Sequence, residues 1–219
     1  MNTRIIFLDE LNRLRRDVLT MATRVEEDLG KTLTALRNND VELAKEVVAG
    51  DAVVNAIQLK IEDETAKIVA TQQPVARDLR EMVTIFKLTS NLERMDDHVV
   101  HLAKTVINLS GEPPFRSTEH MEKMAETGRE MIRDSISAYL NQDAEGARKT
   151  ALLDDKIDSE HKALTEEILS LMKEHPEYIQ KAAGVLKTSG HLERLGDHIT
   201  NICESIIYMT EGKHEELNR

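Results

Sequence analysis

The chain contains the same pattern twice, and this duplication limits what it can fold into more than any other feature. A shift of 100 residues lays NLERMDDH (91–98) on HLERLGDH (191–198), with five of the eight residues identical. Earlier in each half, Asp51 matches Asp154 at a shift of 103. Because the offset changes by only three residues across the unit, the two halves are predicted to share one architecture.

Each half is predicted to form three long helices. Apolar residues recur at three- and four-residue steps, the period of an amphipathic helix. Asp40 is expected to cap the second helix, and Pro74 to open the third, because proline is tolerated at the start of a helix but not inside it. The predicted segments of the first half are 11–36, 41–69 and 74–109, and those of the second half are 121–140, 144–172 and 176–210.

The predicted fold is therefore all-α, with six long helices in two tandem, pseudo-symmetric three-helix bundles. Composition agrees, because aromatic residues make up 3% of the chain and there are nine Gly and four Pro, so strand and turn formers are scarce. The segment SGEPPFR (110–116) contains two consecutive prolines and is the predicted linker. It separates a first bundle, 1–110, from a second, 117–219.

Charge and cysteine content limit the partners and the compartment. The net charge of -11 would repel both a phosphate backbone and an anionic membrane surface, so no nucleic acid is expected as a partner. Cys203 is the single cysteine and cannot form an intramolecular disulfide. No segment approaches the ~18 apolar residues of a membrane span, so a soluble, cytoplasmic protein without membrane insertion is expected.

The repeated element carries paired carboxylates, Glu93 with Asp97 and Glu193 with Asp197, at a spacing that places each pair on one helix face. Both pairs lie roughly 150° from the centre of the main apolar stripe of their helix. The preceding helices carry polar stripes that the pairs could face: Asp51, Asn55, Gln58 and Glu62 in the first half, and Asp154, Asp158, His161 and Thr165 in the second.

If these stripes lie beside the pairs, each half presents a cluster of oxygen ligands at its surface. Hard cations such as Mg²⁺, Ca²⁺ and Mn²⁺, and oxygen-ligated iron, bind such clusters. The other interpretation is that these are ordinary solvated helix faces, which are the norm on surface helices.

Other polar residues give weaker signals. His98 and His101 are expected to be ordinary helix-surface histidines, since the second copy has His198 with Asn201. Cys203 is expected to be a small core residue rather than a nucleophile. Arg94 and its copy Arg194 adjoin the acidic pairs as ion-pair partners or as contacts for phosphate or protein.

The repeated LERMDDH and LERLGDH, together with QPVARDLR (73–80) and GD-x-x-VN (50–55), resemble the PhoU family of phosphate-transport accessory proteins. The resemblance implies a regulator that restrains phosphate uptake and phosphate-starvation signalling. It also implies partners in the phosphate ABC transporter, through its cytoplasmic ATPase subunit, and in a sensor histidine kinase. A homodimer is a further expectation.

Members of this family carry an E/D-x-x-x-D signature that binds metal, so the resemblance implies divalent or iron ions, with Fe, Mn, Mg, Zn and Ni all open. The signature maps onto Glu93 with Asp97, Glu193 with Asp197, and Asp154 with Asp158. Two positions depart from it. Asp51 is followed by Asn55, which changes the charge of one site, and Asp96 replaces the usual glycine before Asp97, which adds a candidate ligand.

The residues and the resemblance together favour a non-enzymatic regulator that binds metal and protein partners. The alternative is a carboxylate-bridged di-iron enzyme inside a helical bundle, which needs Glu-x-x-His motifs projecting into the core. Here the candidates are Glu211 with His214, in a tail, and Asp158 with His161. A purely structural scaffold with solvated acidic faces is the third possibility.

Overall fold

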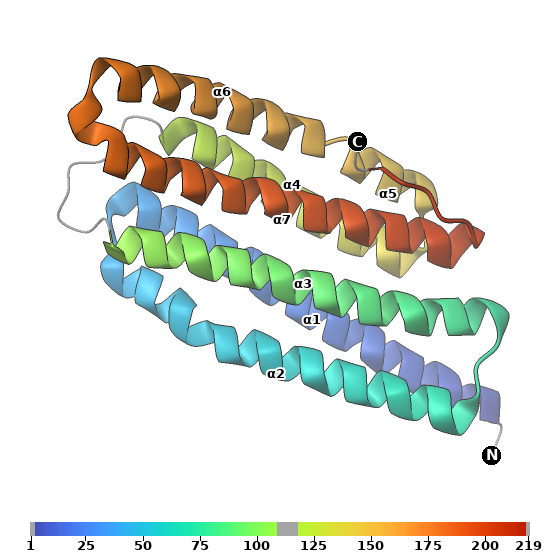
Figure 1. The fold of residues 1–219 in the computed structure, drawn as a ribbon. Helices are drawn as coiled ribbons and strands as arrows, with labels where there is room; N and C mark the ends of the chain where they lie inside the picture. Colours follow the sequence, from blue (N-terminus) through green and yellow to red (C-terminus); the bar gives the residue numbers. More distant parts are fainter. Residues whose placement is uncertain (1–2, 109–117, 218–219) are drawn as a thin grey trace.

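A computed structural model of the chain describes residues 3–108 and 118–217, and the regular structure within these residues is helical (Figure 1). This confirms the all-α prediction. The elements are α1 (Thr3–Asn38), α2 (Val41–Gln72), α3 (Ala76–Asn108), α4 (Thr118–Asn141), α5 (Ala144–Ala151), α6 (Asp154–Glu174), a 3₁₀ turn η1 (Pro176–Tyr178) and α7 (Ile179–Glu211).

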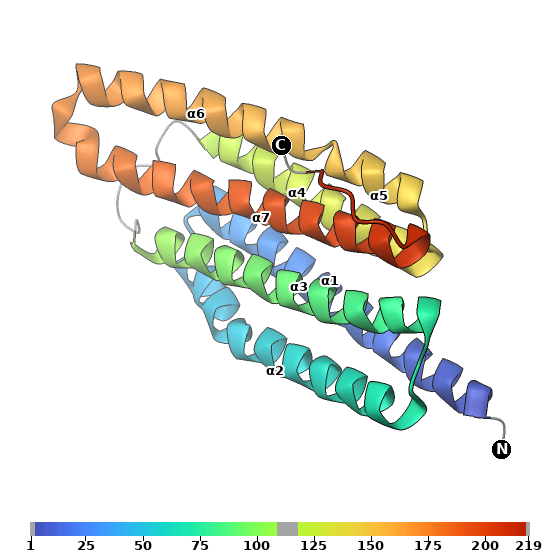
Figure 2. The same ribbon diagram turned by 45° about the vertical axis from the view of Figure 1, so that its right-hand side comes forward.

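The helices form two bundles that lie side by side (Figures 1 and 2). Helices α1, α2 and α3 pack against one another, as do α4, α5, α6 and α7, and the two groups meet through α3 with α7 and through α1 with α4. The apolar stripes predicted from the sequence form the core, for example Leu14 and Val18 of α1 and Leu92 and Leu192 of the repeated element. The tandem, pseudo-symmetric bundle architecture is confirmed.

Contacts between α3 and α7 show that these two helices run antiparallel. The Thr84 hydroxyl donates to the Ser205 carbonyl at 3.2 Å, and His98 faces His191 with 3.1 Å between their Nδ1 atoms. His198 Nδ1 lies 2.9 Å from Asn91 Oδ1. Under the 100-residue shift, the pair of positions 98 and 191 is equivalent to the pair 198 and 91, so one pseudo-two-fold relation accounts for both contacts.

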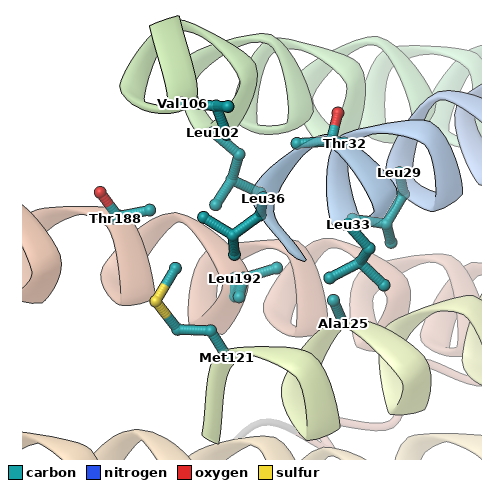
Figure 3. A pocket seen from close by; sticks show the side chains of 10 residues that line it. All are labelled: Leu29, Thr32, Leu33, Leu36, Leu102, Val106, Met121, Ala125, Thr188 and Leu192. Atoms are coloured by element: carbon teal, nitrogen blue, oxygen red, sulfur yellow. The ribbon is translucent and has the colours of Figure 1, made fainter. Parts of the chain in front are cut away.

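The junction of the bundles is packed rather than hollow. Figure 3 shows the side chains around a small void between α1, α3, α4 and α7, lined mainly by Leu, Met and Val. The void offers about 10 Å³ to the centre of a water molecule. That is room for about one water, so this void is a gap in the core rather than a ligand pocket.

The turn chemistry predicted from the sequence is largely present. The Asp40 carboxylate accepts a hydrogen bond from the backbone N–H of Leu43 at 3.0 Å, and Asp143 does the same for Gly146 at 2.9 Å. Pro74 lies between α2 and α3 instead of opening the helix, which begins at Ala76. The predicted linker, 110–116, lies outside the described residues.

The structure corrects one predicted segment, because the continuous helix expected over 144–172 is interrupted. Helix α5 ends at Ala151, and α6 begins at Asp154 after a turn at Leu152 and Leu153. The corresponding α2 runs without a break past Asp51. The break places Asp154 in the first turn of a new helix, where the positive end of the helix dipole favours a carboxylate.

None of the helices in the described part of the chain is long and apolar enough to cross a bilayer.

Candidate metal sites

In the first bundle, the predicted carboxylates come together in the seam between α2 and α3. Asp51 lies on α2 and Glu93 and Asp97 on α3, and all three are half-buried. Burial and the negative charges of Asp97, Asp51 and Glu62 raise the pKa of Glu93, against the opposing effect of Arg94. The polar stripe of α2 therefore lies beside the acidic pair of α3, within the range of direct charge interaction.

The second bundle gathers its carboxylates in the same way between α6 and α7. Glu193 and Asp197 of α7 are half-buried, and burial together with the charges of Asp197 and Asp158 raises the pKa of Glu193. Asp158 is exposed at the rim. Burial and the charge of Asp158 likewise raise the pKa of Asp197.

Asp154 is the innermost carboxylate of the second bundle. Its Oδ2 atom accepts a hydrogen bond from the Thr200 hydroxyl at 3.2 Å, whereas its buried Oδ1 atom has no hydrogen-bond partner among the described residues. Burial, with the charges of Asp158, Asp197 and Glu193, raises the pKa of Asp154 to about 7. A Cβ atom at Gly196 would collide with this Oδ1, so the glycine is what lets the carboxylate approach α7.

These donor sets fit a hard cation. All predicted ligands are carboxylate oxygens, the ligand type that such ions prefer, and the bare Oδ1 of Asp154 is an acceptor that lacks a donor. Across residues 3–108 and 118–217, no three His, Cys, Asp or Glu side chains already surround a single point in the manner of a metal site. Ligation would therefore draw the carboxylates inward from their present positions.

The sequence prediction placed these carboxylates on an outward face, and the structure places six of the seven in half-buried seams. Part of the apolar stripe of α3 and α7 packs at the junction of the bundles, where Leu102 and Leu192 line the same void. The side that carries the carboxylates is covered in part by the neighbouring helix, α2 or α6. Arg94 forms a loose ion pair with the adjacent Glu93, at 3.7 Å.

Three residues of the first bundle extend its site inward, and two of them were missed in the sequence. Asp96 and Asp28 are both buried, and the Arg24 guanidinium donates to Asp28 at 2.6 Å. The signal for Asp28 was its place on the apolar face of α1, three residues after the buried Val25. A charged residue at such a position needs a partner.

Of the two histidines predicted to be ordinary helix-surface residues, His101 is exposed as expected, whereas His98 is half-buried between the two bundles. His98 and His191 contact each other through Nδ1, and the rings of His101 and His191 stack with their centroids 4.8 Å apart. The ring of His198 lies 5.5 Å from that of His98. This correction could not come from one helix alone, because the cluster depends on α3 lying beside α7.

The C-terminal tail covers the second site. It runs back along α5 after α7 ends (Figure 1). Arg148 of α5 forms ion pairs with Glu211, the last residue of α7, at 2.9 Å and with Glu215 of the tail at 2.8 Å. The Leu217 backbone N–H donates to Glu204 at 2.7 Å. A groove of about 550 Å³ lies under the tail, and its lining includes Asp154, Asp158, Asp197, Glu215 and Glu216.

The two motifs considered for a di-iron enzyme do not project into a bundle core. Glu211 pairs with Arg148 at the surface, and the ring of His214 stacks on Tyr208 with the ring centroids 4.3 Å apart. Asp158 is exposed, and His161 Nδ1 lies 3.1 Å from the Ser189 hydroxyl.

Comparison with known proteins finds matches to both bundles. The family model described as the PhoU domain matches the chain twice, over residues 18–106 and 121–206. The chain is 34% identical over 217 residues to the phosphate-specific transport system accessory protein PhoU homolog of Clostridium acetobutylicum, covering 99% of each chain. It is 30% identical over 207 residues to the phosphate-specific transport system accessory protein PhoU of Escherichia coli, covering 94% of this chain and 86% of that protein.

Solved structures give the same result. The crystal structure of PhoU from Pseudomonas aeruginosa superposes with a TM-score of 0.90 at 32% identity, covering 94% of this chain and all of that one. The phosphate transport system regulatory protein PhoU from Streptococcus pneumoniae gives a TM-score of 0.89 at 34% identity, with 95% and 99% covered. Because the PhoU domain matches both halves, and relatives at least 30% identical match over nearly the whole length, this chain belongs to the PhoU family.

Proposed function

We propose that the protein is a non-enzymatic accessory regulator of phosphate transport, which restrains phosphate uptake and phosphate-starvation signalling when phosphate is plentiful. The observation that carries this proposal is the full-length match to proteins named as phosphate transport accessory and regulatory proteins. The two matched segments, 18–106 and 121–206, fall within the two bundles.

The proposed partners are the cytoplasmic ATPase subunit of the phosphate ABC transporter and the sensor histidine kinase, met in the cytoplasm by a homodimer of this chain. A protein with a net charge of -11 gains encounter rate toward a basic partner surface through long-range attraction. Salt screens that attraction over ~8 Å at physiological ionic strength. A regulator of this kind acts by binding one state of its partner more tightly than another.

The proposed metal ligands are Asp51, Glu93 and Asp97 in the first bundle, and Asp154, Asp158, Glu193 and Asp197 in the second. A bound divalent or iron ion would supply positive charge that relieves the repulsion among these carboxylates. The residues themselves would tie α2 to α3 and α6 to α7, because each ligand set spans two helices. The sites would thus stabilise the surface that the partner meets.

Affinity capture tests the partners. The tagged protein, taken from phosphate-replete cells with its membranes solubilised, should retain the transporter ATPase or the sensor kinase at low salt and lose it progressively as salt is raised. Recovery of neither protein at low salt, in material where both are abundant, would refute the partner assignment.

Metal analysis tests the ligands. Glu193→Gln with Asp197→Asn keeps the side-chain shapes and removes two charges, and should lower bound metal by about one site's worth in protein purified without chelator. The matched control is Glu130→Gln with Asp134→Asn, an exposed pair at the same spacing on α4. Equal metal in both variants would place the ligands elsewhere.

A further inference from the structure

Asp96 is an unusual buried group in the interior of the first bundle. The residue is 2% exposed, and neither of its carboxylate oxygens has a hydrogen-bond partner in the described part of the chain. A carboxylate removed from water without a donor or a counter-charge is strongly unfavourable. The second bundle has Gly196 at the equivalent position, so this group belongs to one half only.

The surroundings of Asp96 add negative charge. The carboxylates of Asp28, Asp51 and Asp97 lie close enough to repel its negative charge, and the Arg24 guanidinium attracts it. Asp28 already holds the nearby cations, with Arg24 Nε at 2.6 Å from Oδ2 and Lys31 Nζ at 3.7 Å from Oδ1. The Oδ1 atom of Asp28 is itself buried without a hydrogen-bond partner among the described residues. Asp96 is therefore the buried carboxylate of this cluster that has neither an ion pair nor a hydrogen-bond donor among the described residues.

Comparison of the two halves shows what Asp96 replaces. In the second bundle the inner carboxylate is Asp154, which reaches over Gly196 and accepts a hydrogen bond from Thr200. In the first bundle the positions of Gly196 and Thr200 are occupied by Asp96 and Val100. A side chain at position 96 fills the space that Asp154 uses, so Asp51 cannot adopt the position of Asp154. The inner carboxylate of the first site thus comes from α3, whereas that of the second site comes from α6.

We propose that Asp96 is the inner ligand of the first metal site, with Asp28 beside it and Asp51 at its mouth, and that together they hold one hard divalent cation of the Mg²⁺ or Mn²⁺ type. This proposal rests on the metal-binding part of the proposed function and adds that the two sites are built differently. The ligands are oxygen only, which favours such ions over softer metals. The half-buried Asp51 is the group that would turn inward to complete the set.

Mn²⁺ titration of the full-length, chelator-stripped protein tests the proposal, with free Mn²⁺ followed by electron paramagnetic resonance. The Glu193→Gln and Asp197→Asn changes are kept in every sample so that the first site is observed. Asp96→Asn should weaken Mn²⁺ binding at least about tenfold, since even supporting groups around a metal ligand change affinity by 10–100-fold. Asp63→Asn, at an exposed position on α2, is the matched control and should leave binding unchanged.

The Asp96→Asn variant also distinguishes an Asp96 carboxylate that binds a cation from one that is protonated. If Asp96 is simply protonated and donates to Asp28, the asparagine amide supplies the same donor, and binding of Mn²⁺ stays as in the parent. That result would overturn the proposal. If Glu93→Gln with Asp97→Asn weakens Mn²⁺ binding while Asp96→Asn does not, Asp96 is not a ligand, and the metal site proposed at Glu93 and Asp97 is supported. If neither variant changes binding, both the inner site and the first surface site fail.

A second variant tests the proposal independently if Asp96→Asn does not fold. Asp96→Gly gives the first bundle the residue that the second already carries, and should let Asp51 move in as Asp154 does. Asp51→Asn should then weaken Mn²⁺ binding several-fold more in the Asp96→Gly background than in the parent. Equal effects in the two backgrounds would contradict the exchange of inner ligands between α2 and α3.

Discussion

His98 and His191 face each other between the bundles. Their protonation and that of the buried carboxylates change the free energy of unfolding in opposite directions as pH falls. Burial, followed by the charges of neighbouring histidines and of Arg194, lowers the pKa of both histidines to about 4. Between pH 6.5 and 4 the unfolded chain therefore binds protons here that the folded chain does not, and the free energy of unfolding falls as pH falls. Asp96 and Asp154, whose pKa values are raised to about 7, bind protons first when folded and contribute the opposite slope.

Replacing one histidine of this pair should change the pH dependence of stability. In chelator, His191→Gln should reduce the loss of unfolding free energy between about pH 7 and about pH 5 by about 1 kcal/mol, because 1.36 kcal/mol corresponds to one unit of pKa shift. Urea denaturation of both proteins at the two pH values measures this. His175→Gln, whose ion pair with Glu177 is exposed, is the control and should change the pH dependence less than His191→Gln does. A parallel pH dependence for His191→Gln and the parent would show that the pair is not held neutral.

At the residue scale, the sequence predicted the features that depend on a single helix. It did not predict the features that depend on contact between two helices. The helical period and the 100-residue copy place Glu93 with Asp97 on one face, and the carboxylates of α2 do lie beside them. The same copy placed His98 and His198 at equivalent positions. Their burial depends on the antiparallel packing of α3 on α7, which no pattern within a single helix encodes.

Among the elements, the junction of α5 and α6 shows the limit of local propensity. Leu152 and Leu153 are good helix formers, and neither Gly nor Pro marks the interruption, so the continuous helix predicted over 144–172 followed from the residues. The tertiary contact of Asp154 with Gly196 accompanies the break instead. By contrast, Asp40 caps α2 as predicted, because its bond to Leu43 lies within four residues.

The C-terminal tail is a separate element that is held by Arg148 near its start and by Glu204 at Leu217. Arg148→Gln removes the ion pairs to Glu211 and Glu215, and should increase the rate of tryptic cleavage after the exposed Lys213 several-fold while leaving the helical content unchanged. Mass spectrometry of the released tail follows the reaction. Lys149→Gln, whose ion pair with Glu145 stays within α5, is the control. Equal cleavage rates in all three proteins would mean that Arg148 does not hold the tail.

Close approach of α4 to α7 depends on Gly128. A Cβ atom there would lie 2.9 Å from Leu195 Cδ2, whereas nothing lies within 4 Å of a Cβ atom at Gly184 of α7. Gly128→Leu should therefore lower the free energy of unfolding by about 1–3 kcal/mol through overpacking. Gly184→Leu should be neutral or raise it by up to about 1 kcal/mol through helix propensity. Thermal and urea unfolding compare the two, and similar stabilities would contradict the tight α4–α7 contact.

For the whole molecule, the duplicated architecture carries two acidic sites that are related but not identical. The first has Asp28, Asp96 and Arg24 in its interior, and the second has Asp154 over Gly196 with the C-terminal tail across its groove. The duplication and the fold class could be predicted from the sequence. The difference between the sites depends on side chains meeting across helices, and it appears once the bundles are assembled.

The most direct measurement of the central claim is phosphate uptake and phosphate-starvation gene expression in cells that lack this protein and hold no second copy of the family. A regulator changes the output of its partner without abolishing it. The account predicts that the transporter still works in the deletion strain, that uptake and starvation-gene expression stay high in plentiful phosphate, and that the wild-type chain restores repression. Normal repression in the deletion strain under the same conditions would contradict it.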